Sequence, residues 1–246
     1  MRPSDLKNQL VLALVFLTRL PLGGLLPEHE VPLMRSLWAF PLAGALVGAV
    51  SALPLMLLPG PPLVLATLAV LLAIWLTGGL HEDGLADFTD GMGGADRAER
   101  LRIMRDPYIG SYGTLALILC IVLRVVSIAA LGPLALIGAA AGGRAAMVLA
   151  LTILPPARSD GLGRAAGRPG KGQALVSGLI GLAALALSGP MALAGLICLI
   201  LAAGLVIRLA RTRLGGQTGD VLGTVSVLGE TAALTAMAVY ASRALA

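Results

Sequence analysis

Charged and aromatic side chains are both scarce in this 246-residue chain. Asp, Glu, Lys and Arg make up 13% of it, and Phe, Trp and Tyr make up 3%. An average soluble domain carries about 25% charged residues. Hydrophobic residues account for 57%, and the mean hydropathy is +0.92. This balance excludes an ordinary soluble domain and indicates a protein that uses the lipid bilayer as its solvent.

Cysteine is nearly absent, and the basic residues form no nucleic-acid-binding pattern. Cys120 and Cys198 both lie inside apolar runs with no Cys or His at ligand spacing, which excludes a disulfide framework and a zinc site. The net charge of +5 comes from arginines placed between apolar segments, without interleaved aromatics. We therefore expect no nucleic acid partner and interpret the charge as a determinant of membrane orientation.

Seven apolar stretches come near the roughly 20 residues that cross a bilayer. They cover approximately residues 37–58, 63–80, 112–131, 134–154, 174–188, 191–207 and 221–240. They lack the alternating polarity of barrel strands, and the 32 glycines suit close contact between helices. The sequence predicts an all-α fold: one domain over residues 1–246, a polytopic integral membrane bundle of about seven transmembrane helices.

The segments between these stretches predict the orientation. The breaks at 59–62, 132–133 and 189–190 are short and uncharged, whereas 82–106, 158–171 and 208–213 are long or basic. The positive-inside rule places the second set in the cytoplasm. Residues 6–20 are then predicted to form an N-terminal interfacial helix with Lys7 and Arg19 among the headgroups, bordered by membrane lipid. A first span with an external N-terminus is the alternative.

The densest polar feature, HEDGLADFTDGMGG, covers residues 81–94. Asp83, Asp87 and Asp90 stand at positions i, i+4 and i+7. If the preceding span continues as a helix, they fall within an arc of about 60°. Three carboxylates on one stripe repel each other, so we expect a bound cation, and Mg²⁺ shares carboxylates with substrate phosphates. The alternative is a solvated acidic loop that balances the nearby arginines.

His81 and the arginines that follow the acidic motif are further candidates. His81 suits a general base or acid, since its unperturbed pKa is near neutrality, or it is a helix-end histidine bonded to backbone. Arg97, Arg100 and Arg105 suit a nucleotide diphosphate, because guanidinium binds phosphate in a bidentate manner. The alternative for each arginine is that its charge only sets the orientation of the chain in the membrane.

Three charged residues fall within spans, and a second glycine-rich junction opens the last one. Arg124, Arg144 and Glu230 are costly in lipid unless they are paired or face a cavity, so each is a functional candidate, with a structural ion pair as the alternative for Arg124. The junction over 215–223 reads GGQTGDVLG. Its Asp220 either caps the helix or is a further ligand for metal or substrate.

Together these motifs resemble the cobalamin synthase family, and the resemblance covers nearly the whole chain. It rests on Gly79–His81, Asp83–Asp87, Asp90–Gly91, Ile103–Asp106 with Gly110 and Gly113, and Gly215–Gly223 with Glu230; supporting pieces are Thr18–Pro21, Phe40–Gly44, Gly143–Arg144, Ala157–Arg158 and Gly161–Gly163. The acidic motif followed by Gly-Thr-Gly-Asp is specific. Glu82 and Pro107–Tyr108 depart from the expected pattern, beside the carboxylates rather than on them.

The resemblance implies an Mg²⁺-dependent transfer of adenosylcobinamide phosphate. The donor would be adenosylcobinamide-GDP, the acceptor α-ribazole or its 5′-phosphate, and the released product GMP. It implies catalytic roles for His81 and the four aspartates, with the aspartates on the metal. The substrate-binding residues would be Arg97, Arg100, Arg105, Asp106, Arg144, Gly216, Thr218, Gly219 and Glu230. Neither the resemblance nor the sequence decides whether the protein forms a homo-oligomer.

Two other function classes remain as alternatives. Residues 87–91 reproduce the opening Asp-x-x-Asp-Gly of CDP-alcohol phosphotransferases, but Gly94-Ala95 stands where that family requires Ala-Arg. A transporter would explain the charges within spans, but its carboxylates should lie at mid-membrane rather than at span ends.

Overall fold

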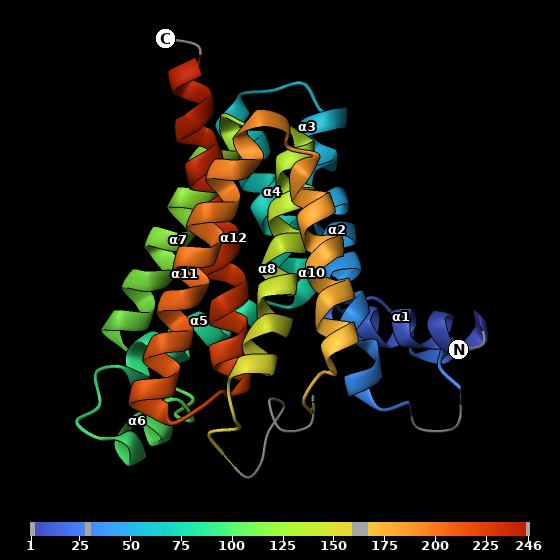
Figure 1. The fold of residues 1–246 in the computed structure, drawn as a ribbon. Helices are drawn as coiled ribbons and strands as arrows, with labels where there is room; N and C mark the ends of the chain where they lie inside the picture. Colours follow the sequence, from blue (N-terminus) through green and yellow to red (C-terminus); the bar gives the residue numbers. More distant parts are fainter. Residues whose placement is uncertain (1–2, 28–30, 159–166, 245–246) are drawn as a thin grey trace.

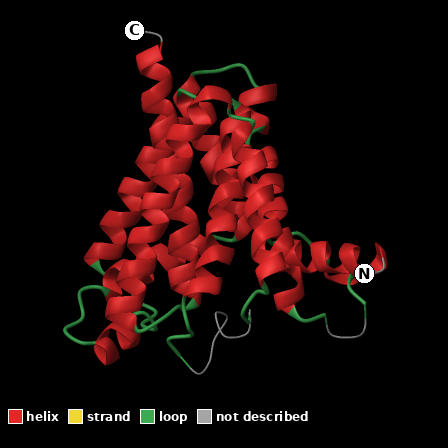
Figure 2. Cartoon of the chain, viewed as in Figure 1, coloured by secondary structure: helices red, strands yellow, loops and turns green. Residues whose placement is uncertain are grey.

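The computed structural model describes residues 3–27, 31–158 and 167–244, and these are mostly helical. Within the described ranges no β-strand forms, and the only strand-like pairing is an isolated bridge between Pro156 and Gln217. Figure 2 shows helices joined by short loops. The predicted all-α fold is confirmed.

Five described helical segments are long and apolar enough to cross a membrane. The first joins η2 (Leu33–Ala39), α2 (Phe40–Ser51) and α3 (Leu53–Leu57). The others are α7 (Ser111–Ala129), α8 (Pro133–Ile153), α11 (Ala192–Leu209) with the turns at its two ends, η3 (Gly189–Met191) and η4 (Ala210–Leu214), and α12 (Gly219–Ala244). The chain is therefore a multi-pass membrane protein.

The predicted number of seven spans is approximate. Helix α10 (Lys171–Ala186) coincides with the fifth predicted stretch but has only 16 residues. Helices α4 (Pro62–Thr77) and α5 (Leu80–Gly91) are long and apolar enough to cross a membrane only if the bent pair forms one span, which raises the number from five to six. Helix α8 lies at the centre of the bundle (Figure 1). The protein buries 78% of its apolar stretch, against 22% for the segment that contains α11.

The pair α4 and α5 corrects one prediction. The acidic motif does not continue the preceding span, because α5 is bent by 88° from α4 and runs across the bundle. The cause is Gly78 and Gly79, which have φ angles of +68° and +72°. Two successive left-handed residues end a helix, and glycine adopts this conformation without a steric penalty.

Helix α5 crosses the start of α12 at close range. A Cβ atom on Gly84 would lie 2.9 Å from the backbone oxygen of Asp220, and the Thr224 hydroxyl donates a 2.9 Å hydrogen bond to the Gly84 oxygen. Small residues permit such close approach of helix backbones. The two carboxylate-bearing junctions are thereby brought together.

Helix α1 (Pro3–Leu17) lies crosswise to the bundle (Figure 1). Its Gln9 side chain accepts a 2.7 Å hydrogen bond from the indole of Trp38 in η2. With 15 residues, α1 is not among the candidate spans. This placement favours the interfacial helix over the alternative of a first span.

Candidate active site

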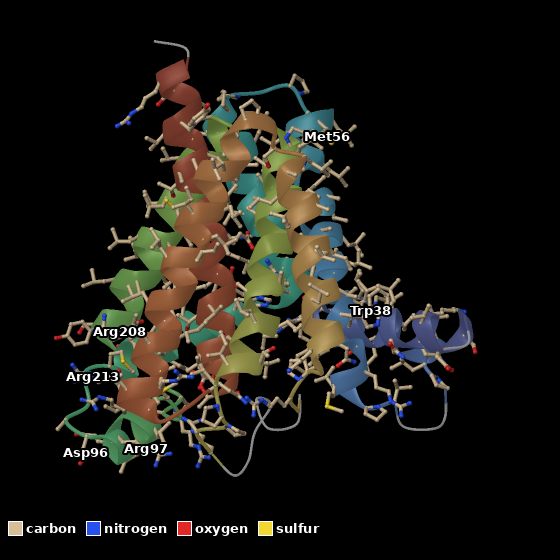
Figure 3. All side chains as sticks on the ribbon, viewed as in Figure 1. Trp38, Met56, Asp96, Arg97, Arg208 and Arg213 are labelled. Atoms are coloured by element: carbon tan, nitrogen blue, oxygen red, sulfur yellow. The ribbon has the colours of Figure 1, made fainter. Side chains whose placement is uncertain are left out.

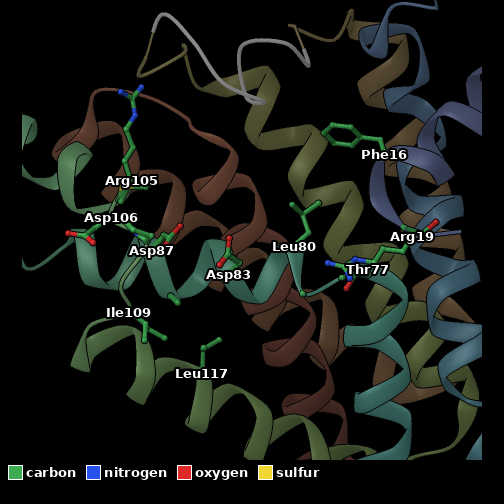
Figure 4. Close-up of a pocket in the computed structure, with 16 residues that line it drawn as sticks. Phe16, Arg19, Thr77, Leu80, Asp83, Asp87, Arg105, Asp106, Ile109 and Leu117 are labelled. Atoms are coloured by element: carbon green, nitrogen blue, oxygen red, sulfur yellow. The ribbon is translucent and has the colours of Figure 1, made fainter. Parts of the chain in front are cut away.

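An open pocket of about 830 Å³ lies where the end of α1, the turn between α4 and α5, and the segment before α7 meet. Figure 4 shows residues that line it. Those the argument uses are Phe16, Arg19, Leu80, Asp83, Asp87, Arg105 and Asp106. Figure 3 shows Arg97, Arg208 and Arg213 at the same end of the molecule, and Met56 at the opposite end. The pocket therefore lies at the arginine-rich end of the bundle.

Asp83 and Asp87 stand one helical turn apart on α5 and both line the pocket. Helix α5 is not one of the five helical segments that are long and apolar enough to span by themselves. Burial, followed by the charges of Asp83, Asp220 and Asp90, raises the pKa of Asp87 to about 7, against the opposing charge of Arg158. Carboxylates this close are unfavourable together without a counter-charge.

Asp90, predicted on the same stripe, has another partner. Its Oδ2 atom accepts a 2.7 Å hydrogen bond from the Gly110 N–H, and its Oδ1 atom accepts one of 2.9 Å from the Gly113 N–H. Both donors are orphan amides at the start of α7, where the helix dipole also favours a negative charge. Asp90 therefore anchors α7, and the structure does not place it among the residues that line the pocket.

Asp220 joins the acidic group from the far end of the chain. It borders a smaller cavity of about 140 Å³ together with His81 and Asp83. Its carboxylate accepts a 3.2 Å hydrogen bond from the Thr218 hydroxyl and lies 3.8 Å from the Arg158 guanidinium. The cap of α12 is Thr218, whose Oγ1 accepts a 3.3 Å hydrogen bond from the Val221 N–H. Among the described hydrogen bonds, none joins a backbone N–H to the Asp220 side chain.

His81 is buried, with 2% exposure, and lines the same smaller cavity. Neither imidazole nitrogen has a hydrogen-bond partner among the described residues. The alternative of a histidine bonded to backbone therefore finds no support. A buried polar group without a partner is rare and suggests a ligand contact.

The predicted diphosphate-binding arginines separate into two groups. Arg97 donates to the backbone oxygens of Leu214 (2.7 Å) and Ala157 (2.8 Å), which ties α6 (Arg97–Ile103) to the chain before α12. Arg100 is buried and donates to the Ala95 oxygen at 3.0 Å. Only Arg105 of the three lines the pocket, beside Asp106. The structure therefore gives Arg97 and Arg100 structural contacts instead of places at the pocket.

The charges within the spans form one buried network. Arg124 on α7 binds Glu82 of α5 at 2.7 Å and Glu230 of α12 at 2.8 Å. Arg144 of α8 also pairs with Glu230. Two arginines and two glutamates balance their charges, as buried ions require. The network therefore holds four helices together, and it includes Arg144 and Glu230, which were predicted to bind substrate. The ion-pair alternative for Arg124 is confirmed.

The second glycine-rich junction is joined to the end of α8. The Gln217 N–H donates to the Pro155 oxygen and the Ala157 N–H donates to the Gln217 oxygen, both at 2.8 Å. A Cβ atom on Gly216 would overlap the Pro155 oxygen. Gly219 lines the smaller cavity, whereas Gly216 serves packing and Thr218 serves the cap.

Arg19 is a pocket residue whose position the sequence did not predict. It was assigned to the headgroups, yet it lines the pocket beside Gly78 and Leu80. The available signal was the Thr18–Pro21 piece of the family resemblance, which carried no role.

No three His, Cys, Asp or Glu side chains converge into a closed metal site within the part of the chain that the structure describes. Mg²⁺ rarely needs one, because it commonly binds one or two carboxylates and completes its shell with water and substrate phosphates. The oxygen donors of Asp83 and Asp87, and the raised pKa of Asp87 beside other carboxylates, fit such a site.

Comparison with known proteins gives one consistent result. Residues 9–238 match the family described as cobalamin-5-phosphate synthase. Proteins named adenosylcobinamide-GDP ribazoletransferase are 45% identical in Azorhizobium caulinodans, over 98% of this chain and 99% of that protein, and 42% identical in Bradyrhizobium diazoefficiens, over 93% and 92%. The Allorhizobium ampelinum protein of that name is 39% identical, over 94% and 96%. No solved structure matches the chain.

Proposed function

This chain belongs to the cobalamin-5-phosphate synthase family, and from that premise we propose that it is an Mg²⁺-dependent adenosylcobinamide-GDP ribazoletransferase. The whole chain would act as one catalytic domain. It would transfer adenosylcobinamide phosphate from adenosylcobinamide-GDP to α-ribazole or α-ribazole 5′-phosphate and release GMP. The observation that carries the proposal is the meeting of Asp83, Asp87 and Asp220 beside an open pocket.

Displacement at a diphosphate phosphorus requires charge neutralisation more than a covalent nucleophile. Asp83 and Asp87 would hold Mg²⁺, with the charge of Asp220 nearby, and the bound ion would neutralise charge on the transferring and leaving phosphate oxygens. Asp90 would act indirectly, by fixing the start of α7 against the end of α5. Arg105, which lines the pocket, would bind the phosphate of the leaving GMP.

The acceptor hydroxyl must lose a proton as it attacks. We assign this proton to His81, because its nitrogens have no partner among the described residues and it borders the cavity shared with Asp83 and Asp220. The hydroxyl oxygen bonds to the phosphorus of the corrinoid phosphate while the bond to the GMP oxygen breaks. The imidazole retains the proton, and GMP carries away the electron pair of the broken bond.

The arginine-rich end supports a cytoplasmic active site in a bacterial inner membrane. Cysteine labelling in intact cells tests this orientation with Arg102→Cys, at the pocket end, and Gly60→Cys, at the other. Labelling of Gly60→Cys alone by an impermeant reagent is expected; labelling of Arg102→Cys alone would contradict the orientation.

The two alternatives lose support from the structure. The charges that motivated a transporter are neutralised within the network of Arg124, Arg144, Glu82 and Glu230. The start of a CDP-alcohol motif, Asp87 and Asp90, is divided between the pocket and the anchor of α7.

The activity test uses purified protein in lipid nanodiscs with adenosylcobinamide-GDP and either acceptor. Chromatography should detect GMP together with the joined corrinoid product. EDTA should abolish both and added Mg²⁺ should restore them. Absence of GMP release with both acceptors would reject the proposed function, and unchanged release in EDTA would reject only the metal.

A further inference from the structure

The backbone and side chain of Arg19 are both held against the end of α4, at the edge of the pocket. Helix α1 ends at Leu17, and the Arg19 N–H then donates a 2.7 Å hydrogen bond to the Leu76 oxygen near the end of α4. The guanidinium lies against Gly78, where a Cβ atom would overlap it. Gly78 therefore serves both the left-handed turn and the seat of this side chain.

The Arg19 guanidinium is exposed at the pocket and forms no ion pair within the described residues. Arg97 and Arg100 instead bind backbone oxygens, and Arg158 lies near Asp220. A guanidinium that is held in place by its backbone, faces a pocket and has no carboxylate partner is suited to an anionic ligand.

The two arginines of the pocket lie at opposite ends of it. Figure 4 shows Asp83 and Asp87 between Arg105 on one side and Arg19 on the other. In-line displacement places the leaving group and the attacking group on opposite sides of phosphorus. If the carboxylates mark the reacting phosphorus, one arginine serves the leaving GMP and the other serves the acceptor.

The surroundings of Arg19 identify its end as that of the acceptor. The smaller cavity shares Phe16, Leu80 and Asp83 with the pocket, and its other walls include Phe40, Met147 and Leu151. A small apolar cavity of this kind fits an aromatic base, and the larger pocket that shares its wall has room for the ribose and its phosphate. Arg105 lies at the other end, in the segment that follows the arginine-rich α6.

We propose that Arg19 binds the 5′-phosphate of the acceptor nucleotide and is the residue by which the protein distinguishes α-ribazole 5′-phosphate from α-ribazole. The inference rests on the proposed function, because the acceptor is that of the proposed reaction. Arg19 acts in recognition, and the chemistry remains with the carboxylates and His81.

Steady-state kinetics of GMP release tests this distinction, with each acceptor and the donor varied in turn. Arg19→Gln should raise KM for the 5′-phosphate by about 10- to 100-fold, the loss of a charge-assisted bond to phosphate. KM for α-ribazole and for the donor should stay within about twofold, since neither interacts with Arg19. Arg19→Lys keeps a point charge and should recover part of the loss.

Arg102→Gln is the matched control, because Arg102 is an exposed arginine of α6 that does not line the pocket. It should leave all three KM values unchanged. Equal losses with both acceptors, a raised KM for the donor, or a wild-type protein without preference would overturn the role of Arg19. Absence of GMP release by the wild type with either acceptor would instead overturn the proposed function and this inference with it.

Discussion

Glu82 and Asp83 are neighbours in the sequence, carry the same charge and have opposite surroundings. Glu82 is buried and pairs with Arg124, whose second bond reaches Glu230. Asp83 is exposed, lines the pocket and has Asp87 one turn away. One face of α5 thus carries a carboxylate that a buried arginine neutralises, and the other carries carboxylates that face the pocket. We infer that the first face holds the helix in place and that the second takes part in the reaction.

The largest effect is expected where the carboxylates face the pocket. Asp83→Asn and Asp87→Asn should each reduce turnover by about 1,000-fold, because each removes charge that counts most in the transition state. The temperature of thermal unfolding should hardly change, since neither side chain makes a packing contact that the amide lacks. GMP release and thermal unfolding in nanodiscs measure the two effects.

Glu99→Gln is the matched control for these variants. It makes the same carboxylate-to-amide change on α6, and the amide oxygen can still accept the 2.9 Å hydrogen bond from the Ala95 N–H. Wild-type turnover by both aspartate variants would remove the pocket face of α5 from the chemistry.

The opposite pattern is expected on the buried face. Arg124→Gln leaves the Glu82 carboxylate buried without its cation and should destabilise the protein by about 3–5 kcal/mol. Turnover per folded molecule should fall much less than in the Asp83 variant. Adding Glu82→Gln to Arg124→Gln should recover part of the stability, because the unpaired charge is removed. Unchanged thermal unfolding of Arg124→Gln would show that the network does not hold α5.

Asp220 tests whether the pocket chemistry extends to α12. Asp220→Ser should reduce turnover by about 100-fold while thermal unfolding changes little, because Thr218 caps the helix. The test is a titration of GMP release against Mg²⁺. An active variant with an unchanged Mg²⁺ requirement would assign Asp220 to a structural role beside Thr218.

The sequence predicted what depends on local windows. Apolar runs and basic loops predicted the helical bundle and its arginine-rich end, because hydropathy is a property of consecutive residues. The bend at Gly78 and Gly79 was not predicted, because two glycines in a sequence do not by themselves show whether a helix continues or ends. Asp83 and Asp87 line one pocket, in agreement with their predicted shared face, whereas the direction of their helix relative to α4 was not predicted.

The partners of long side chains were the part that sequence could not supply. Arg97 binds the oxygen of Leu214, 117 positions away in the chain, and no local pattern distinguishes this from a phosphate contact. Arg19 shows the reverse case, because its place at the pocket depends on the packing of α1 against the end of α4. Spacing predicts shared faces, but it does not predict what each face meets.

The smallest effect is expected at Asp90, which lies on α5 between the two kinds of surroundings. Its two oxygens accept the Gly110 and Gly113 amides, so Asp90→Asn keeps one acceptor and turns an N–H₂ group toward the other amide. We expect a loss of about 1–2 kcal/mol in the free energy of unfolding. Turnover should fall by about tenfold or less, because α7 shifts slightly against the site. The Mg²⁺ concentration for half-maximal turnover should stay within about twofold of the wild-type value, since the metal charge rests on other carboxylates. If Asp90 instead binds the metal, this concentration must rise steeply while the free energy of unfolding stays constant. Asp90 would then belong with Asp83 and Asp87 to the catalytic residues of α5, and its contact with α7 would be secondary.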